Sequence, residues 1–198
     1  ESIVVCGAAR TPIGKFMGGL SDVPAVDLAV TAATSALERA GCSAGAVDQV
    51  FVGMARQAGE GPNIARQITL GAGLPQSAVA MTVNQACASG LRALSLGAQE
   101  IQSGAAQVVL VGGVETMSRN PFLLTGMRKG YRLGDAPLLD GNYQDGFNCP
   151  LVGTPMGATA ETLADQFEIT REQQDAFAVE SQRKAAAAVE QGRFRDEI

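Results

Sequence analysis

The chain has 198 residues, of which 46% are hydrophobic and 18% charged, and its formal net charge is −5. This composition is typical of a folded globular chain and excludes a largely disordered one. An acidic chain is not expected to bind nucleic acid, which favours a basic surface. No apolar run approaches the roughly 18 residues that a membrane-spanning helix needs, so we expect no membrane partner.

The cysteines predict a reduced, intracellular chain. Cys6, Cys42, Cys87 and Cys149 lie at wide, irregular spacings that fit neither a metal site nor a dense disulfide framework. The opening residues, "ESIVVCGAARTP", lack the charged and apolar regions of a signal peptide. We therefore expect free thiols and a cytoplasmic location.

Up to Glu115, apolar runs alternate with helical patterns. Strands are predicted at 2–6, 47–54, 78–84 and 107–115, the last as a central strand because it is apolar on both faces. Helices are predicted between Pro24 and Gly41 and over about 64–72 and 86–102. This alternation predicts an α/β layer architecture with a mainly parallel sheet.

After Glu115 the pattern changes. Residues 118–153 are rich in glycine and proline and keep no period, which is typical of a binding loop or lid. One helix is predicted after Thr154 as N-cap with Pro155 in its first turn. A second is predicted after a capping box, Thr170 to Gln173. The final "FRDEI" is typical of the approach to another strand, so we expect the chain to be part of a longer protein.

Cys87 lies where the third predicted strand meets the following helix, and two interpretations are open. Cys87, Leu91 and Leu94 share one helical stripe with Ala98 and Ile101, so the pattern alone favours a small core residue. Alternatively, a thiol in the first helical turn faces unpaired N–H groups and the positive end of the helix dipole, which favour a reactive thiolate. The same amides could then serve an oxyanion hole.

The segment "NQACASGLRAL" around Cys87 resembles the acyl-enzyme cysteine motif of the thiolases. Further segments are similar to thiolase segments and occur in the same order: "ARTPIGKFMGGL", "AGEGPNIARQ", "GGVETMS", "PMGATAE" and "REQQDAFAVESQRKA". The resemblance covers essentially the whole chain and stops about halfway through a typical member. It implies a layered α/β/α fold with an inserted Gly/Pro-rich loop domain. Residues 1–117 would form the core domain that carries Cys87, residues 118–198 would belong to the loop domain, and the C-terminal half would be absent.

The resemblance implies a transferase of fatty acid metabolism, an acetyl-CoA C-acetyltransferase that carries out a reversible Claisen condensation through an acyl-enzyme on Cys87. Such a two-stage transfer predicts ping-pong kinetics. The alternatives are a medium- or long-chain 3-ketoacyl-CoA thiolase and a non-catalytic acyl-CoA-binding protein. Pro155 stands where short-chain biosynthetic members often carry histidine, which leaves the acyl chain length open.

The resemblance also assigns two substrate-binding residues and the partners. Met156 matches a methionine that lines the acyl pocket, and Phe147 lies where an apolar residue contacts pantetheine, although both residue types more often belong to a core. Coenzyme A thioesters are the expected substrates, without a metal or further cofactor, and a homodimer or homotetramer is expected. The chain has no histidine. The family's catalytic histidines and second cysteine would lie in the C-terminal half, so these 198 residues are expected to be inactive alone, with Cys6, Cys42 and Cys149 structural.

Overall fold

The computed structural model describes residues 2–198, which divide into two compact units: one that runs to Asn142 and one of Tyr143–Ile198. The helices and strands of the first unit are α1 (Ala25–Ala40), β1 (Gln49–Gly53), α2 (Ile64–Gly71), β2 (Val79–Val83), α3 (Ser89–Gln102), β3 (Val109–Gly113), β4 (Phe122–Leu123) and β5 (Leu139–Asp140), with short 3-10 turns at Ala44–Ala46 and Met117–Arg119.

The first unit is built on a parallel sheet with the strand order β2-β1-β3. Gln49 at the start of β1 pairs with Val79 of β2 and with Val109 of β3, and both registers run in parallel to the strand ends. The predicted α/β architecture with a parallel sheet is therefore confirmed. Within the described residues the central strand is β1, so the prediction of a central strand at 107–115 was wrong for this sheet.

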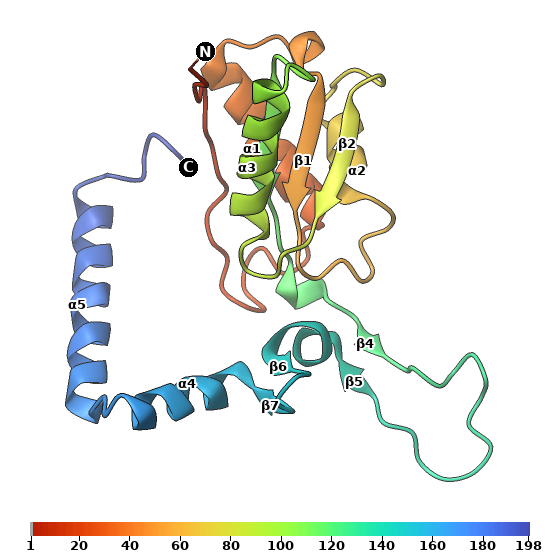
Figure 1. Cartoon of the computed structure of the whole chain (residues 1–198), viewed down its shortest axis with the longest axis vertical. Coiled ribbons are helices and arrows are strands. Elements are labelled where there is room, and N and C mark those ends of the chain that lie inside the picture. Colours follow the sequence, from red (N-terminus) through yellow and green to blue (C-terminus); the bar gives the residue numbers. More distant parts are fainter. Residues whose placement is uncertain (1) are drawn as a thin grey trace. The chain divides into compact units, whose positions relative to one another are not determined.

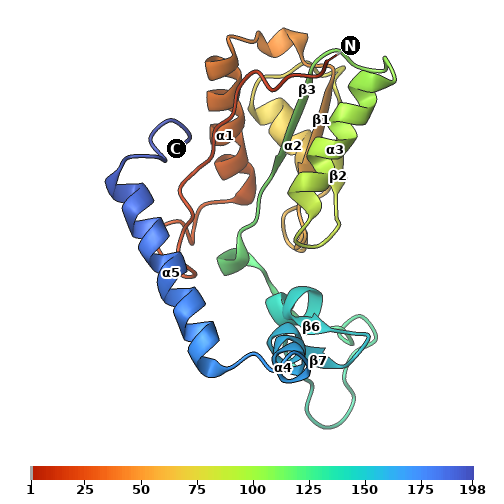
Figure 2. The ribbon, with the colours of Figure 1, turned by 60° about the vertical axis from the view of Figure 1, so that its left-hand side comes forward.

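Helices cover both faces of this sheet (Figures 1 and 2). The helix α3 packs on β1 and β3, whereas α2 packs on β1 and β2, and α1 packs on α2. Parallel strands need such crossover connections, and helices on both faces bury the sheet. The glycine expected to end α1 does so, because Gly41 adopts a left-handed conformation with φ 59°.

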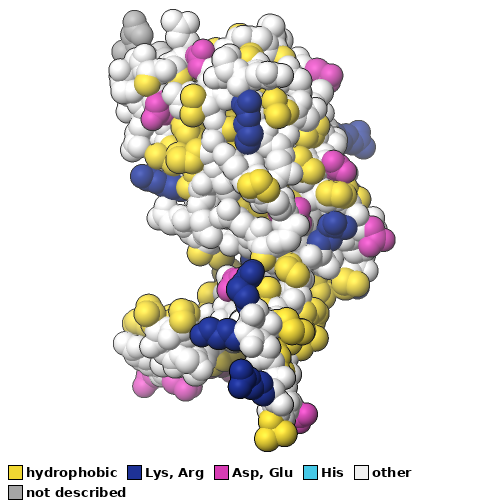
Figure 3. Space-filling model, turned by 90° about the vertical axis from the view of Figure 1, so that its right-hand side faces the viewer, with side chains coloured by type: hydrophobic (Ala, Val, Ile, Leu, Met, Phe, Trp, Pro, Cys, Tyr) yellow, Lys and Arg dark blue, Asp and Glu magenta, His cyan; other side chains and the backbone are white. Residues whose placement is uncertain are grey.

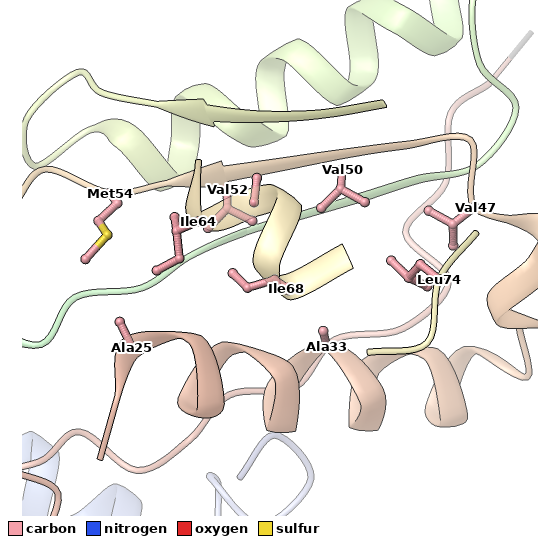
Figure 4. Close-up of a cluster of buried hydrophobic side chains, with 10 residues drawn as sticks. Ala25, Ala33, Val47, Val50, Val52, Met54, Ile64, Ile68 and Leu74 are labelled. Carbon is pink, nitrogen blue, oxygen red and sulfur yellow. The ribbon is translucent and has the colours of Figure 1, made fainter. Parts of the chain in front are cut away.

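The main core lies between β1 and the two helices α1 and α2 (Figure 4). Val50 and Val52 point from β1 toward this side and are at most 4% exposed, together with Ile64 and Ile68 of α2. Phe51 is also buried but lies outside this cluster. Because side chains alternate along a strand, Phe51 faces the opposite side of the sheet, where α3 packs.

The predicted strand at residues 2–6 is not formed. No strand of the described residues pairs with this segment, and Val4 and Val5 are 69% and 77% exposed. A β-branched run forms a strand only where a neighbouring strand supplies the hydrogen bonds, and sequence pattern does not reveal that neighbour.

Residues that follow β3 are hydrogen-bonded to the segment that precedes α1. Ser118 Oγ accepts from the Met17 N–H at 2.9 Å, and Arg119 donates to the Asp22 carbonyl at 3.2 Å. The compact first unit therefore extends to Asn142, past the domain boundary that was expected at residue 117. Whether residues 118–198 act as one loop domain stays a prediction.

The second unit is a short π-helical turn, two short strands and two helices: η3 (Tyr143–Phe147), β6 (Asn148–Cys149), β7 (Thr154–Pro155), α4 (Met156–Gln166) and α5 (Arg171–Glu190). The capping box predicted at the start of α5 is confirmed, with Thr170 and Gln173 exchanging side-chain and backbone hydrogen bonds. At α4 the N-cap is Pro155 rather than Thr154, because Thr154 pairs with Cys149 between β6 and β7. Residues 191–197 form turns rather than an approach to a strand.

The Gly/Pro-rich stretch contributes surface rather than core in this chain. Leu133 and Leu151 are 99% and 92% exposed.

On the face in Figure 3, hydrophobic side chains reach the surface at several separate places, with Lys and Arg side chains between them. The described residues contain no helix that is both long and apolar enough to cross a membrane.

Candidate functional site

The candidate site is the carboxyl edge of the parallel sheet. Three segments leave the sheet there: residues 54–56 after β1, residues 84–88 after β2 and residues 114–116 after β3. In open α/β sheets, ligands bind outside the carboxyl ends of the strands. Cys87 belongs to the segment after β2 and is exposed, so the structure places its thiol at the edge where such folds bind ligands.

The turn that carries Cys87 has an unusual backbone. Ala86 has φ 49°, a left-handed conformation that a non-glycine residue adopts only at some cost. Its N–H donates to Asn84 Oδ1 at 3.0 Å. Ser89 Oγ accepts from the Gln85 N–H at 2.9 Å and donates to the Ala86 carbonyl at 2.5 Å. These hydrogen bonds compensate for the strain and fix the backbone next to Cys87.

Glycines let α3 approach the sheet closely beside this turn. A Cβ on Gly53, the last residue of β1, would stand 2.6 Å from the Gly90 nitrogen and the Ser89 oxygen. A Cβ on Gly113, at the end of β3, would stand 3.3 Å from the Gly90 Cα. The first turn of α3 therefore rests directly on the ends of β1 and β3, which fixes the position of the Cys87 turn along the edge.

The helix itself begins later than the sequence predicted. It starts at Ser89 with Ala88 as N-cap, so Cys87 precedes the helix instead of lying in its first turn. The N–H groups of Ala88 and Ser89 donate to the carbonyls of Gln85 and Ala86, both at 3.1 Å. The turn thus occupies two of the amides that were expected to be unpaired there. A prediction from helical period could not show this, because the turn combines these backbone hydrogen bonds with those of the Asn84 and Ser89 side chains.

The interpretation of Cys87 as a core residue was wrong for this chain. Its stripe partners Leu91 and Leu94 are 73% and 46% exposed. The face of α3 that packs on the sheet instead carries the small buried residues Ser89, Ala93 and Gly97. A Cβ on Gly97 would come within 2.6 Å of Val111, so the helix lies too close to the sheet for leucine side chains between them.

A second set of hydrogen bonds links the three segments at the carboxyl edge. The Glu115 carboxylate accepts from the N–H of Ala55 at 3.1 Å and from the N–H of Arg56 at 3.0 Å. Asn84 Nδ2 in turn donates to the Ala55 carbonyl at 3.1 Å. Residues that follow β3, β1 and β2 are therefore joined in one chain of contacts that ends beside Cys87.

Asn84, Ser89 and Glu115 received no role from sequence reasoning. The available signal was position: Asn84 directly follows β2, and Glu115 lies two residues after the end of β3, where α/β folds place functional polar groups. The buried hydroxyl of Ser89, which is 4% exposed, had no comparable signal.

The two other predicted site residues belong to the second unit. Met156 is the first residue of α4 and is 45% exposed. Phe147 ends η3 and is half-buried, and its ring meets Tyr143 edge-on with centroids 5.5 Å apart. Cys87 belongs to the first unit, and the roles of Met156 and Phe147 in acyl and pantetheine binding stay predictions.

The remaining cysteines are free thiols, of which Cys6 is exposed and Cys42 and Cys149 are partly buried. Among residues 2–198, no group of three or more His, Cys, Asp or Glu side chains is arranged to hold a metal ion.

Comparison with known proteins gives a consistent result. The chain is 48% identical to an acetyl-CoA acetyltransferase of Pseudomonas aeruginosa over 198 residues, which are all of this chain and 50% of that protein. It is 47% identical to an acetyl-CoA acetyltransferase of Escherichia coli, again over 100% of this chain and 50% of the relative. The chain therefore spans about half the length of the curated relatives it matches.

Solved structures show the same relationship. The structure of acetyl-CoA acetyltransferase from Syntrophomonas wolfei superposes with a TM-score of 0.96 at 44% identity, covering 98% of this chain and 50% of that one. The Acat5 thiolase from Ascaris suum, solved in complex with coenzyme A, gives a TM-score of 0.94 at 37% identity over the same shares. The thiolase N-terminal domain model matches residues 3–198. Taken with the layered α/β fold and the braced cysteine turn, these matches show that the chain belongs to the thiolase family.

Proposed function

We propose that the protein containing this chain is a thiolase that transfers acyl groups between coenzyme A thioesters, with Cys87 as the nucleophile. The exposed Cys87 thiol, held at the carboxyl edge of the parallel sheet by a hydrogen-bonded turn, carries the proposal. The acetyl-CoA acetyltransferases among the relatives, and the coenzyme A bound to the Ascaris suum thiolase, support the choice of acyl carrier.

The proposed reaction has two stages. In the first, Cys87 gives its thiol proton to a base, the thiolate adds to the thioester carbonyl of an acyl-CoA, the bond from that carbonyl to the coenzyme A sulfur breaks, and the same proton passes to the departing coenzyme A. In the second, an acetyl-CoA loses a proton from its α-carbon, this carbon forms a bond to the acyl carbonyl on Cys87, and the bond from that carbonyl to the Cys87 sulfur breaks. The product is a 3-ketoacyl-CoA, and the Cys87 thiol is restored by the proton. Neither stage oxidises or reduces a group, and we propose no further cofactor.

The base for these steps is proposed to come from outside residues 1–198. The chain has no histidine, which is the usual partner of a nucleophilic cysteine. Within the site, Asn84 and Ser89 are already engaged in holding the turn. We therefore expect these 198 residues alone to show no turnover.

Acetyl transfer is the preferred specificity because the relatives are named acetyl-CoA acetyltransferases. Transfer of longer chains is the second candidate, because Pro155 stands directly before Met156, where the short-chain biosynthetic members that this sequence resembles often carry histidine. The ratio of kcat/KM for thiolysis of acetoacetyl-CoA to that for a 3-ketoacyl-CoA with a longer chain distinguishes the two. A ratio well above one supports the short-chain assignment, and a ratio below one supports the longer-chain assignment.

The test of the proposed function is thiolysis by the full-length protein and its Cys87→Ala variant, followed as loss of acetoacetyl-CoA absorbance. We expect kcat to fall by about a thousandfold or more, because the covalent route through the cysteine is lost. Cys6→Ala is the matched control, since it removes another exposed thiol and should keep wild-type turnover. Full activity in Cys87→Ala would overturn the assignment of the nucleophile.

A further inference from the structure

The segment that carries Cys87 is linked by hydrogen bonds to the segments that follow β1 and β3. The first link is Asn84, within the Cys87 segment, whose Oδ1 accepts the Ala86 N–H and whose Nδ2 donates to the Ala55 carbonyl. Ala55 lies just beyond the end of β1, in a segment without a regular structure of its own. The position of the Cys87 turn therefore depends on what holds Ala55.

Glu115 holds that segment. Its Oε2 accepts the Ala55 N–H and its Oε1 accepts the Arg56 N–H, so both carboxylate oxygens are engaged by adjacent amides. Hydrogen bonds from backbone amides to an ionised carboxylate are stronger than those between neutral groups. The Ala55 peptide is thereby oriented with its carbonyl toward Asn84.

We propose that Glu115 is a positioning residue for Cys87, acting through Ala55, Asn84 and Ala86. The bridge runs from the end of β3, across the end of β1, to the turn after β2, and each step is a hydrogen bond of 3.0–3.1 Å. That the group so positioned is a nucleophile rests on the proposed function. The bridge itself rests only on the geometry.

The chain provides a matched control at the opposite edge of the same strands. Asp48 precedes β1 and accepts the N–H groups of Gln107 and Val108 at 2.7 and 3.0 Å, just before β3 begins. Asp48 and Glu115 thus make the same kind of contact between β1 and β3, but only Glu115 contacts the segment that Asn84 binds. If the Glu115 contact served only to hold β1 and β3 together, substitution of Glu115 or of Asp48 would change the exchange at residues 84–88 and the acylation of Cys87 to the same extent.

The test uses the full-length protein with Glu115→Gln and Asp48→Asn. Each substitution replaces one carboxylate oxygen by an NH₂ group, which cannot accept a hydrogen bond. Amide hydrogen exchange is measured in peptides that cover residues 84–88, and the rate of Cys87 acylation by acetyl-CoA is measured in a rapid-mixing experiment. In Glu115→Gln we expect exchange at 84–88 to rise about tenfold and the acylation rate to fall by a similar factor. Asp48→Asn should leave both at the wild-type level and raise exchange near residues 106–109 instead.

A second variant tests the same bridge from the other end. Asn84→Asp keeps an acceptor for the Ala86 N–H but removes the donor to Ala55. If both residues act through one path, the double variant Glu115→Gln/Asn84→Asp should show no more exchange at 84–88 than the more affected single variant. Asn84→Asp alone tests the bridge if Glu115→Gln does not fold.

The proposal is overturned if Glu115→Gln leaves exchange at 84–88 unchanged, if Asp48→Asn raises it equally, or if exchange rises while the acylation rate of Cys87 stays the same. A wild-type protein that takes no acyl group on Cys87 contradicts the proposed function instead. In that case the exchange measurement still decides the bridge, because it requires no acyl transfer.

Discussion

Ala86 is the residue on which the geometry of the Cys87 turn depends. Its left-handed φ of 49° directs the chain from β2 toward the start of α3, and Asn84 and Ser89 hold it there. Alanine tolerates this conformation because its side chain is small, whereas a β-branched side chain crowds the following carbonyl.

Ala86→Val is therefore expected to lower the free energy of unfolding by about 1–2 kcal/mol. It should also slow the acylation of Cys87, because the turn can relax only by moving that residue. Ala86→Gly removes the crowding and should unfold at close to the wild-type urea concentration. Urea denaturation followed by circular dichroism checks the stability of both variants, and a Val variant as stable as wild type would show that the turn is not strained.

Residue identity alone located Cys87, but it did not describe the turn. The sequence motif drew attention to the thiol, and its position at the end of a predicted strand was correct to within a few residues. The positive φ of Ala86 is not readable from the sequence, since alanine is an ordinary helix former. The turn is held by the side chains of Asn84 and Ser89 together. The pattern of residue types along the sequence does not show that both side chains bind the same turn.

At the scale of elements, the seating of α3 on the sheet is the feature that fixes the site. Gly53 and Gly113 leave room for the backbone of Gly90, and Gly97 leaves room for Val109 and Val111. Protein interiors are close-packed, so even one added methyl group at such a contact must displace the helix.

Gly53→Ala is expected to cost about 1–3 kcal/mol of stability, because its Cβ would meet the backbone of Ser89 and Gly90 rather than a side chain that can move. The displacement should also reduce turnover, since the Cys87 turn is continuous with α3. Gly112→Ala is the matched control in β3, where no atom of residues 2–198, apart from the two chain neighbours of Gly112, lies within 4 Å of the added Cβ. Equal losses of stability in the two variants would contradict the close seating of α3.

The elements that could be predicted were those specified by local signals. The capping box at Thr170 and Gln173 and the stop at Gly41 are properties of adjacent residues, and both are confirmed. The packed face of α3 and the absence of a strand at 2–6 depend on what lies opposite. For Leu91 and Leu94, hydrophobic period indicated a buried face, but the close approach of the sheet selected the small residues instead.

For the first unit as a whole, a carboxylate that joins the segments before β1 and β3 contributes to the stability of the fold. Asp48 directly precedes β1 and accepts hydrogen bonds from the N–H groups of Gln107 and Val108, which directly precede β3. These hydrogen bonds, with that of Gln107 foremost, hold the pKa of the Asp48 carboxyl below its ordinary value of 3.8. Ionised Asp48 therefore stabilises the folded state relative to the unfolded chain.

The sign of the pH dependence follows from this lowered pKa. The contribution of Asp48 is fully present above the unfolded pKa near 3.8 and is lost as the pH falls through the lower folded value. We expect Asp48→Asn to lower the melting temperature at neutral pH, and the difference from wild type to shrink as the pH falls below about 4. Melting curves of both proteins over this range check it, and a difference that stays constant with pH would contradict the role of the ionised carboxylate.

At the scale of the whole protein, we propose that Cys87 carries the acyl group between the two coenzyme A thioesters. The most direct measurement is the intact mass of the full-length protein before and after treatment with acetyl-CoA, followed by peptide mapping of the adduct. We expect one acetyl group, located on Cys87 and discharged when coenzyme A is added. An adduct on another residue, or no adduct on Cys87 in a protein that turns over acyl-CoA, would contradict it.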